Sequence, residues 1–385
     1  MGTLNRKVAV IGAGATTYAM HFTKSYYDLI AEAYQNAIGS IGPEFDPRKI
    51  ESAWLATVMK NPIHGSAITQ ATGLVGLAST RVENMCVAGG DAFRNAVLGV
   101  ASGAYDLVMV IGAEKMCEPD FEAGGRAAFG WPHPEADYGL SAPGILGMYG
   151  ARHMYEYGTT KEQLAMVEVK NRQHACGNPL AYFRKPVTVE DVLNSPKICW
   201  PFNLLDCCPE ADGASCVILA SEEVAKRYTT KPVWVRGVGM ATDQQSLSDK
   251  LSLSEMLPVI LAGKKAYEMA GVGPEDIDVA EVHDCFTVTE ILLYEALGFC
   301  EKGMGGPYIQ DGNGYLGTKL AINASGGLLG KGHPLGSTGV GQICEVFWQL
   351  RGEAVGRQQE NAKIGLQNNT GGMAFSCSAV NILGI

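Results

Sequence analysis

Short hydrophobic runs alternate with amphipathic helical patterns along the first part of the chain. Residues 7–14, 50–58 and 106–112 are apolar, partly β-branched runs, which predict buried strands. Residues 26–38 place leucine, isoleucine and alanine on one helical face, and residues 64–77 predict a helix of small side chains. This alternation of strands and helices is typical of an α/β fold.

Much the same order returns later in the chain. The predicted strands are residues 232–239, 277–282 and 362–369, and the predicted helices are 253–270, 287–297 and 340–350. Two runs of similar element order, without matching residue identities, predict an internal duplication. In such a repeat the loop at 333–338 takes the place that 86–90 holds in the first run, so we expect both loops at one site.

The stretch from 117 to 231 interrupts this repeat. After a part rich in glycine, proline and aromatic residues it carries helical patterns at 142–157 and 161–176 and a strand at 213–220. We interpret it as an excursion over the mouth of a site, because structured loops on a rigid scaffold commonly hold substrate. Five of its basic residues can pair with phosphates, although a solvated face is the favoured interpretation for most of the five. They are Lys170, Arg172, His174, Arg184 and Lys185.

The composition indicates a well-buried, enzyme-like protein. Of the 385 residues, 46% are hydrophobic and only 18% are charged, which allows an ample core. The formal net charge of −10 argues against nucleic acid as the main partner. No apolar run reaches membrane-spanning length, and residues 1–7 contain no hydrophobic region of a signal peptide, so we expect a cytoplasmic protein with no membrane partner.

Two patterns that can indicate a bound metal or cofactor are incomplete. The 11 cysteines include no Cys-x-x-Cys pair, and Cys207 and Cys208 are adjacent, so we predict free thiols and no metal site. The turn Gly12-Ala13-Gly14 resembles the start of a dinucleotide-binding fingerprint. Thr17 stands where that fingerprint needs glycine or alanine, and no helix follows at once, so we predict no bound dinucleotide.

One cysteine precedes a helix directly. Cys86 follows Asn84-Met85, and small and apolar residues recur at helical spacing over 91–105. Because the unpaired N–H groups of a helix N-terminus favour a thiolate, this position predicts a lowered thiol pKa and a nucleophile. The alternative is a buried cysteine that serves only as a small hydrophobic side chain.

Two histidines lie in loops that suit chemistry. His283-Asp284-Cys285-Phe286 follows a predicted strand, at the edge where α/β sites gather, although a buried structural histidine fits equally well. His333 lies in a run with glycine at six of the 14 positions 326–339, a density that predicts no regular element there. Because Pro334 restricts the backbone of His333, this turn suits a general base, or it is a solvated surface turn.

These three segments together resemble the thiolase superfamily, in particular its sterol-carrier-protein-type and archaeal acetoacetyl-CoA thiolase branch. The resemblance covers essentially the whole chain and rests on Asn84–Gly89, His283–Phe286 and the Gly-His-Pro turn at 332–334. It implies a duplicated fold of two βαβαβαββ halves in five αβαβα layers with an inserted loop domain. The implied domains are an N-terminal half at 1–116 completed by 207–231, a loop domain at 117–206 and a C-terminal half at 232–385.

The resemblance also implies roles for these residues. Cys86 would be the nucleophile that takes the acyl group, and His333 would accept its proton and then stabilise the thioester oxyanion. His283 would supply the second donor of that oxyanion hole. The backbone N–H groups of Cys86 and Gly371 would form another hole for the acyl-enzyme carbonyl, and one such donor is worth about 3 kcal/mol in a transition state.

The chain departs from many thiolases at one position. These carry a second reactive cysteine in a Cys-x-Gly turn near the C-terminus, where this chain has Asn369 in the run 368–372. Asparagine cannot shuttle a proton, so Cys285 becomes the candidate acid/base, as the same branch implies. Cys377 lies beyond the turn and is expected to be structural.

The implied reaction is cleavage of a 3-oxoacyl-CoA by CoA, or the reverse Claisen condensation, through an acyl-cysteine. CoA and acyl-CoA would be substrates, with no bound cofactor. The resemblance further suggests a homodimer or higher oligomer and a small partner subunit of the OB-fold/zinc-ribbon type. A ketosynthase, an aldolase-type relative and a subunit with little activity of its own are the alternatives.

Aromatic residues and methionines of the inserted stretch are candidates for an acyl pocket. They would suit a bulky or aromatic acyl group, although packing within the loop domain or an oligomer interface is the favoured interpretation for most of them. These residues are Phe129, Trp131, Tyr138, Met148, Tyr149 and Met154.

Overall fold

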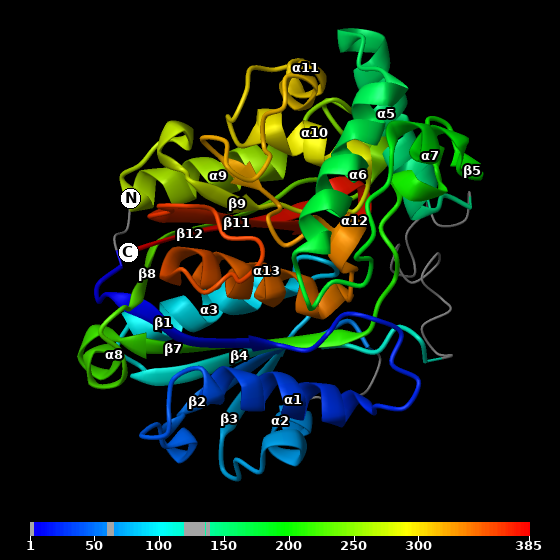
Figure 1. The fold of residues 1–385 in the computed structure, drawn as a ribbon. Coiled ribbons are helices and arrows are strands. Elements are labelled where there is room, and N and C mark those ends of the chain that lie inside the picture. The colour runs from blue at the N-terminus through cyan, green and yellow to red at the C-terminus, as the bar shows by residue number, and fades with distance from the viewer. Residues whose placement is uncertain (1–3, 60–64, 119–134, 136–138) are drawn as a thin grey trace.

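The computed structural model describes residue 135 and three stretches of the chain, residues 4–59, 65–118 and 139–385. Five layers of helices and strands are visible in Figure 1. Two helices, α3 (Ala88–Ala101) and α13 (Leu335–Arg351), form the central layer, and strands lie on both sides of it. This is the α/β class that the sequence pattern predicts, in the five layers that the resemblance implies.

The strands repeat one spatial order twice. The N-terminal layer has the order β3-β2-β4-β7-β1 and the C-terminal layer β10-β9-β11-β12-β8, with parallel pairing among the first three strands of each and antiparallel pairing thereafter. An antiparallel pairing of β1 with β8 joins the two layers edge to edge. The bounds are Val8–Ala15 (β1), Ser52–Ala56 (β2), Ala78–Val82 (β3), Leu107–Glu114 (β4), Gly213–Ser221 (β7), Val233–Thr242 (β8), Val279–Glu281 (β9), Ala321–Ile322 (β10), Ile364–Gly371 (β11) and Cys377–Gly384 (β12).

Further helices cover the outer faces of both strand layers (Figure 1). On the N-terminal layer lie α1 (Tyr26–Gly39) and α2 (Gly65–Thr72), and on the C-terminal layer lie α9 (Leu257–Ala270) and α10 (Thr287–Ala296). Each presents an apolar face to the strands, as the helical periodicity of α1 predicts. The inner strands of both layers, such as β1, β4, β7 and β12, are therefore buried on both faces.

The central helices approach each other at glycines, which explains why α13 tolerates so many. A Cβ atom added at Gly89 would lie 2.8 Å from the backbone nitrogen of Val340, and one at Gly339 would meet the backbone nitrogen of Gly90. Only glycine permits this approach of two helix backbones. The N-termini of α3 and α13 are thereby brought together, and with them the loops that carry Cys86 and His333.

The inserted stretch forms a helical unit at one end of the layers (Figure 1). It contains α5 (Ala142–Tyr157), α6 (Lys161–Cys176) and α7 (Val189–Asn194), followed by the short strands β5 (Lys197–Cys199) and β6 (Phe202–Asn203). Helix α6 packs against α12 (Gly327–Lys331), α10 and α11 (Gly305–Gln310). The unit is thus packed mainly against helices of the C-terminal half.

The solvated-face interpretation is wrong for three of the five basic residues in this stretch. Lys170 is fully buried and pairs with Glu290 at 2.8 Å, Arg172 is mostly buried beside Glu168, and the buried His174 bonds the carbonyl of Asn323. Arg184 and Lys185 are exposed, as expected. These three side chains can be buried because each one is paired with a polar group. Glu290 and Asn323 come from distant parts of the chain, and Glu168 lies on the same helix.

Several element boundaries differ from the prediction. The short strands β3 and β10 have no distinct hydrophobic pattern, and β3 is an edge strand with largely exposed side chains. The glycine-rich run at 326–339, for which no regular element was predicted, contains α12 and the first turns of α13. Tertiary packing accounts for these helical glycines, since the buried run accepts side chains only where neighbouring backbone leaves room.

Among the described residues, none of the helices combines the length and the apolar character needed to cross a membrane.

Candidate active site

The predicted nucleophile lies in a tight turn between β3 and α3. Met85 adopts a left-handed conformation (φ 49°), and the backbone N–H groups of Val87 and Ala88 donate to the carbonyls of Asn84 and Met85. A positive φ in a residue with a side chain is uncommon and is held here by the surrounding hydrogen bonds. The turn places Cys86 two residues before α3, at the helix N-terminus that the sequence predicts.

His333 is fixed at one ring nitrogen and unpartnered at the other. Its Nδ1 lies 2.7 Å from the hydroxyl oxygen of Thr338, and that hydroxyl also lies 2.9 Å from the carbonyl oxygen of Pro334. The ring is buried, and its Nε2 has no hydrogen-bond partner among the described residues. Buried polar atoms are normally paired, so this Nε2 has capacity to hydrogen-bond a reactant.

His283 follows β9 and is held by the C-terminal strand β11. Its Nδ1 lies 3.1 Å from the amide nitrogen of Asn369, whose amide oxygen accepts a hydrogen bond from the N–H of Gly90 at 3.1 Å. Asn369 was dismissed at the sequence level as a lost acid/base. Its contact with a candidate catalytic histidine could not be found from residue type alone.

The structure brings the three predicted residues together. The sulfur of Cys86 and one nitrogen each of His283 and His333 all lie within 4.8 Å of one another. The two rings meet edge to face, with centroids 4.9 Å apart and an interplanar angle of 81°. One sulfur and two imidazole nitrogens at this spacing can perform acyl transfer or hold a soft metal ion, and the geometry alone does not separate these uses.

Cys285 and Gly371 complete the predicted set. The thiol of Cys285 lies 3.6 Å from the hydroxyl of Thr289, and burial, together with the nearby Cys86, raises the pKa of Cys285. Gly371 ends β11 against the nucleophile, where an added Cβ would lie 2.7 Å from the Cβ of Cys86. A side chain at Gly371 would therefore displace Cys86.

Burial, not the helix terminus, sets the protonation of this site. Removal from water raises the pKa of Cys86 to about 12, so the lowered thiol pKa predicted from the helix N-terminus is wrong. Burial also lowers the pKa of His333 to about 3, and burial together with the neighbouring His333 holds the pKa of His283 well below its usual range. At neutral pH the resting site holds a thiol and two neutral imidazoles.

This protonation state makes a kinetic prediction for the free enzyme. The thiolate fraction of Cys86 increases tenfold per pH unit below its raised pKa, so alkylation by iodoacetamide should accelerate steadily from pH 6 to pH 9. The measurement is the second-order rate of carbamidomethylation at the peptide that contains Cys86. A plateau near neutral pH would instead reveal a thiolate–imidazolium pair.

Two carboxylates that the sequence analysis did not single out hold the loops of the site. Asp284 accepts hydrogen bonds from the backbone N–H groups of Leu328 and Leu329, at 2.7 and 3.2 Å, and from the side-chain amide of Asn171. It thereby ties the His283–Cys285 loop to α12, just before His333. The sequence did contain a sign of this role, because Asp284 lies within the motif His283–Phe286.

Glu114 performs a similar task between the two halves. This buried residue at the end of β4 accepts hydrogen bonds from the N–H groups of Val58 and Met59 and, at 2.8 Å, from that of Gly336 in the first turn of α13. Burial raises its pKa to about 7, and its charge in turn raises the pKa of Cys86. It fixes the start of α13 relative to the N-terminal strands.

The proposed acyl-pocket residues divide into two groups. Phe129, Trp131 and Tyr138 lie outside the described residues. Tyr149 is buried in α5, where its hydroxyl donates to the carbonyl of Ala374, and Met154 packs against the same core. Met148 is partly buried on that helix.

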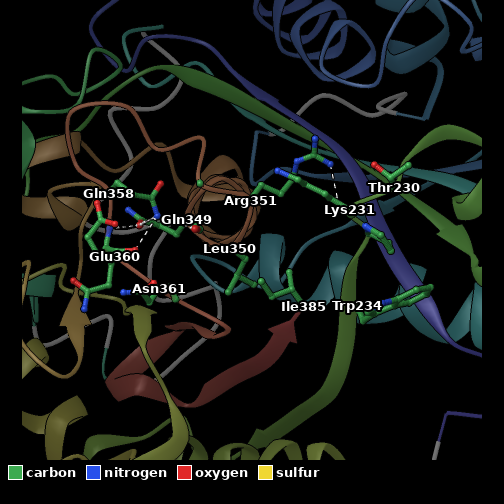
Figure 2. Close-up of a pocket in the computed structure, with 14 residues that line it drawn as sticks. Thr230, Lys231, Trp234, Gln349, Leu350, Arg351, Gln358, Glu360, Asn361 and Ile385 are labelled. Atoms are coloured by element: carbon green, nitrogen blue, oxygen red, sulfur yellow. Dashed lines mark hydrogen bonds between the residues drawn. The ribbon is translucent and has the colours of Figure 1, made fainter.

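A cavity of about 510 Å³ lies away from these residues, at the other end of α13 (Figure 2). It is lined by Trp234, Arg351 and Ile385 among others, and Arg351 is the last residue of α13. The helix has 17 residues, so His333 lies about 25 Å away along its axis. Because of this distance, the cavity does not belong to the candidate site. Some of its polar side chains bond one another, as Gln358 does with Gln349.

Comparison with known proteins shows the family of the chain. Residues 8–199 match the family model described as thiolase, N-terminal domain, and residues 239–385 match the one described as thiolase C-terminal domain-like. The chain belongs to the thiolase family. The predicted family and acyltransferase class are confirmed.

Relatives along the whole chain agree. An acetyl-CoA acetyltransferase of Methanothermobacter thermautotrophicus is 42% identical over 370 residues, covering 95% of this thiolase and 97% of the relative. Sterol carrier protein 2 of Bos taurus is 37% identical over 385 residues, covering 96% and 70% respectively. The benzoylsuccinyl-CoA thiolase subunit BbsB of Thauera aromatica is 34% identical over 381 residues, covering 98% and 97%.

A solved structure matches the fold of this thiolase over its full length. It is described as an Ltp2-ChsH2(DUF35) aldolase, with a TM-score of 0.84, 27% sequence identity and coverage of 100% of this chain and 99% of that one. The solved structure of human mitochondrial 3-ketoacyl-CoA thiolase also matches, with a TM-score of 0.77 and 15% identity over 99% of this chain and 100% of that one. The predicted duplicated thiolase fold is confirmed by this likeness and by the repeated strand order.

Proposed function

We propose that this thiolase cleaves a 3-oxoacyl-CoA with CoA, or runs the reverse Claisen condensation, through an acyl group carried on Cys86. The observation that supports this most is the meeting of the Cys86 sulfur with one nitrogen each of His283 and His333 within 4.8 Å, together with the unpartnered Nε2 of His333. A neutral imidazole beside a thiol is the pairing that acyl transfer to sulfur needs.

In the first half-reaction, His333 Nε2 takes the proton of Cys86 as the sulfur attacks the 3-oxo carbonyl. The bond between C2 and C3 then breaks, which leaves an acyl-Cys86 and an enolate of the departing acyl-CoA. His283 and the newly protonated His333 donate to the enolate oxygen, and the Cys285 thiol protonates C2. Because burial raises the pKa of Cys285, that thiol is protonated at rest, as an acid must be.

In the second half-reaction, CoA gives its thiol proton to the Cys285 thiolate and its sulfur attacks the acyl-Cys86 carbonyl. The backbone N–H groups of Cys86 and Gly371 stabilise that oxyanion in this proposal, which fits the close approach of Gly371 to Cys86. Cys86 leaves and recovers its proton from His333. The order of steps gives ping-pong kinetics, with CoA as substrate and no resident cofactor.

The finer features of the proposal concern substrate and assembly. A bulky or aromatic acyl group is supported by the relative named for benzoylsuccinyl-CoA, and a small OB-fold partner by the neighbour whose description includes a DUF35 partner. We include in the proposal a homodimer or higher oligomer. An aldolase activity, named for that same neighbour, is the second candidate, and the retained Cys86 counts against it because such a cleavage needs no acyl-enzyme.

Intact-protein mass spectrometry tests this function. After incubation with acetyl-CoA, acetoacetyl-CoA or benzoyl-CoA, we expect a covalent adduct of the acyl mass on the wild type and none on Cys86→Ala. Cys377→Ala is the matched control, since Cys377 lies close by on β12 and should leave the adduct intact. An adduct that persists in Cys86→Ala, or none with any donor even after co-expression with a partner subunit, would refute the proposal.

A further inference from the structure

We infer that Asn369 sets the ring tautomer of His283, so that the Nε2 of His283 carries the proton it donates to the substrate oxyanion. Asn369 is thus a positioning residue, in the place where many thiolases carry their second cysteine. The oxyanion in this inference rests on the proposed function, whereas the tautomer of His283 does not and can be measured without any substrate.

The orientation of the Asn369 amide is fixed by α3. The N–H of Gly90 belongs to the first turn of α3, where it has no partner within the helix, and it donates to the Asn369 oxygen at 3.1 Å. The side chain is fully buried, and an added Cβ atom at Gly339 would collide with its amide oxygen. A flipped amide would set its NH₂ against the N–H of Gly90, so the oxygen must face α3.

This orientation leaves the NH₂ group of Asn369 toward His283. An amide NH₂ only donates hydrogen bonds, so the Nδ1 of His283, 3.1 Å away, must accept. A neutral imidazole that accepts at Nδ1 carries its proton at Nε2. The nitrogen that remains free for the reacting groups is therefore an N–H donor.

The neighbouring ring is held in the opposite tautomer. The Thr338 hydroxyl has one proton, and its contact with the carbonyl oxygen of Pro334 requires that proton, because a carbonyl can only accept. The hydroxyl oxygen then accepts from Nδ1–H of His333, which leaves Nε2 of His333 without a proton. The site presents one base and one donor, and Thr338 and Asn369 decide which ring is which.

Few side chains can replace Asn369 in this arrangement. The position needs an acceptor for the N–H of Gly90 and a donor for Nδ1 of His283 within one short planar group. Aspartate keeps the shape and the first contact, but it has no proton to donate when ionised. It would attract a proton to Nδ1, and the neutral ring would then have an acceptor at Nε2.

The test is Asn369→Asp, followed first by NMR. In two-bond ¹H–¹⁵N correlation spectra of protein labelled at its seven histidines, His283 should show the Nε2–H tautomer in the wild type and the Nδ1–H tautomer in the variant. His283→Gln assigns the signal. A wild-type His283 with its proton at Nδ1 would overturn the inference, whatever the protein catalyses.

The second readout is the pH dependence of acetoacetyl-CoA thiolysis. Loss of one oxyanion donor costs roughly 100-fold or more in kcat, so Asn369→Asp should lose about that factor at pH 8 with little change in KM for CoA. At pH 6 the introduced carboxylate favours the imidazolium of His283, which again carries a proton at Nε2, and part of the rate should return. In the part of the chain that the structure describes, the titratable groups that cluster with this ring within 4.8 Å are His333 and Cys86, and His333 stays neutral at pH 6 because burial lowers its pKa to about 3.

Asn368→Asp is the matched control. Asn368 is equally buried on the same strand, but its amide bonds Ser378 and Ala379 and not a histidine. It carries the same cost of burying a carboxylate without the change of tautomer. An equal loss in both variants, or a loss in Asn369→Asp that does not vary with pH, would overturn the inference. If the wild type forms no acyl-enzyme, the proposed function fails while the tautomer result stands.

Discussion

Replacing His333 with glutamine is expected to slow acylation of Cys86 by roughly 10⁴-fold, because the substitution removes the general base. Glutamine can place an amide N–H near the position of Nε2, so it retains an oxyanion donor but accepts no proton from the thiol. His333→Asn is too short to reach that position and should lose the donor as well, for a further roughly 100-fold. The measurement is the single-turnover rate of adduct formation from acetyl-CoA by quenched-flow mass spectrometry.

The pair of variants separates the two roles of this one ring. Because the resting thiol of Cys86 has a pKa raised to about 12, the His333→Gln variant should regain rate steeply toward pH 9, where hydroxide replaces the base. Thr338→Val retains the imidazole while removing its Nδ1 contact and is the milder reference. Equal rates in the glutamine variant and the wild type would show that another group activates Cys86.

Cys285→Ala is expected to reduce cleavage of acetoacetyl-CoA by roughly 10³-fold while acylation of Cys86 by acetyl-CoA falls far less. Cleavage of a carbon–carbon bond leaves a carbanion that needs a proton from Cys285. Transfer from acetyl-CoA expels a thiolate, which can leave unprotonated. The two rates are measured on the same preparation, as loss of acetoacetyl-CoA and as appearance of the adduct.

Cys208→Ala serves as the control for this experiment. Cys208 is a neighbouring thiol whose backbone N–H donates to the carbonyl of Cys285, and no step of the proposed mechanism uses its sulfur. Its removal should leave both rates close to the wild-type values. If Cys285→Ala cleaved acetoacetyl-CoA normally, Cys285 would not be the acid/base, and the second thiol function would have to lie elsewhere.

The reactive groups were predictable because each one lies in a short motif whose residue types have few other uses together. Cys86, His283 and His333 are separated by about 200 and 50 residues. The duplicated order of strands and helices predicted that the loops of Cys86 and His333 meet, and the resemblance to thiolases implied that His283 joins them. That indication was sufficient, since the ends of equivalent elements in two packed halves lie at the same place.

The groups that orient them were not predictable, because each depends on a contact between distant segments. The amide of Asn369 is oriented by a hydrogen bond from the N–H of Gly90, 279 residues earlier. Lys170 can be buried because it forms an ion pair with Glu290. The prediction of a lowered pKa for Cys86 was wrong for a related reason. A helix terminus can be inferred from sequence, but the surrounding protein that excludes water cannot, and here burial outweighs it.

The place of β7 in the sheet limits how much of the fold can form while the chain is being synthesised. Strand β7 lies between β1 and β4 and pairs with both, yet it is made about 100 residues after β4. Until residue 221 has emerged, β1 has no neighbour on either side, since its other partner β8 comes later still. The nascent chain must therefore carry both edges of β1 and one edge of β4 unpaired until β7 is made, and we expect chaperones to matter most in this interval.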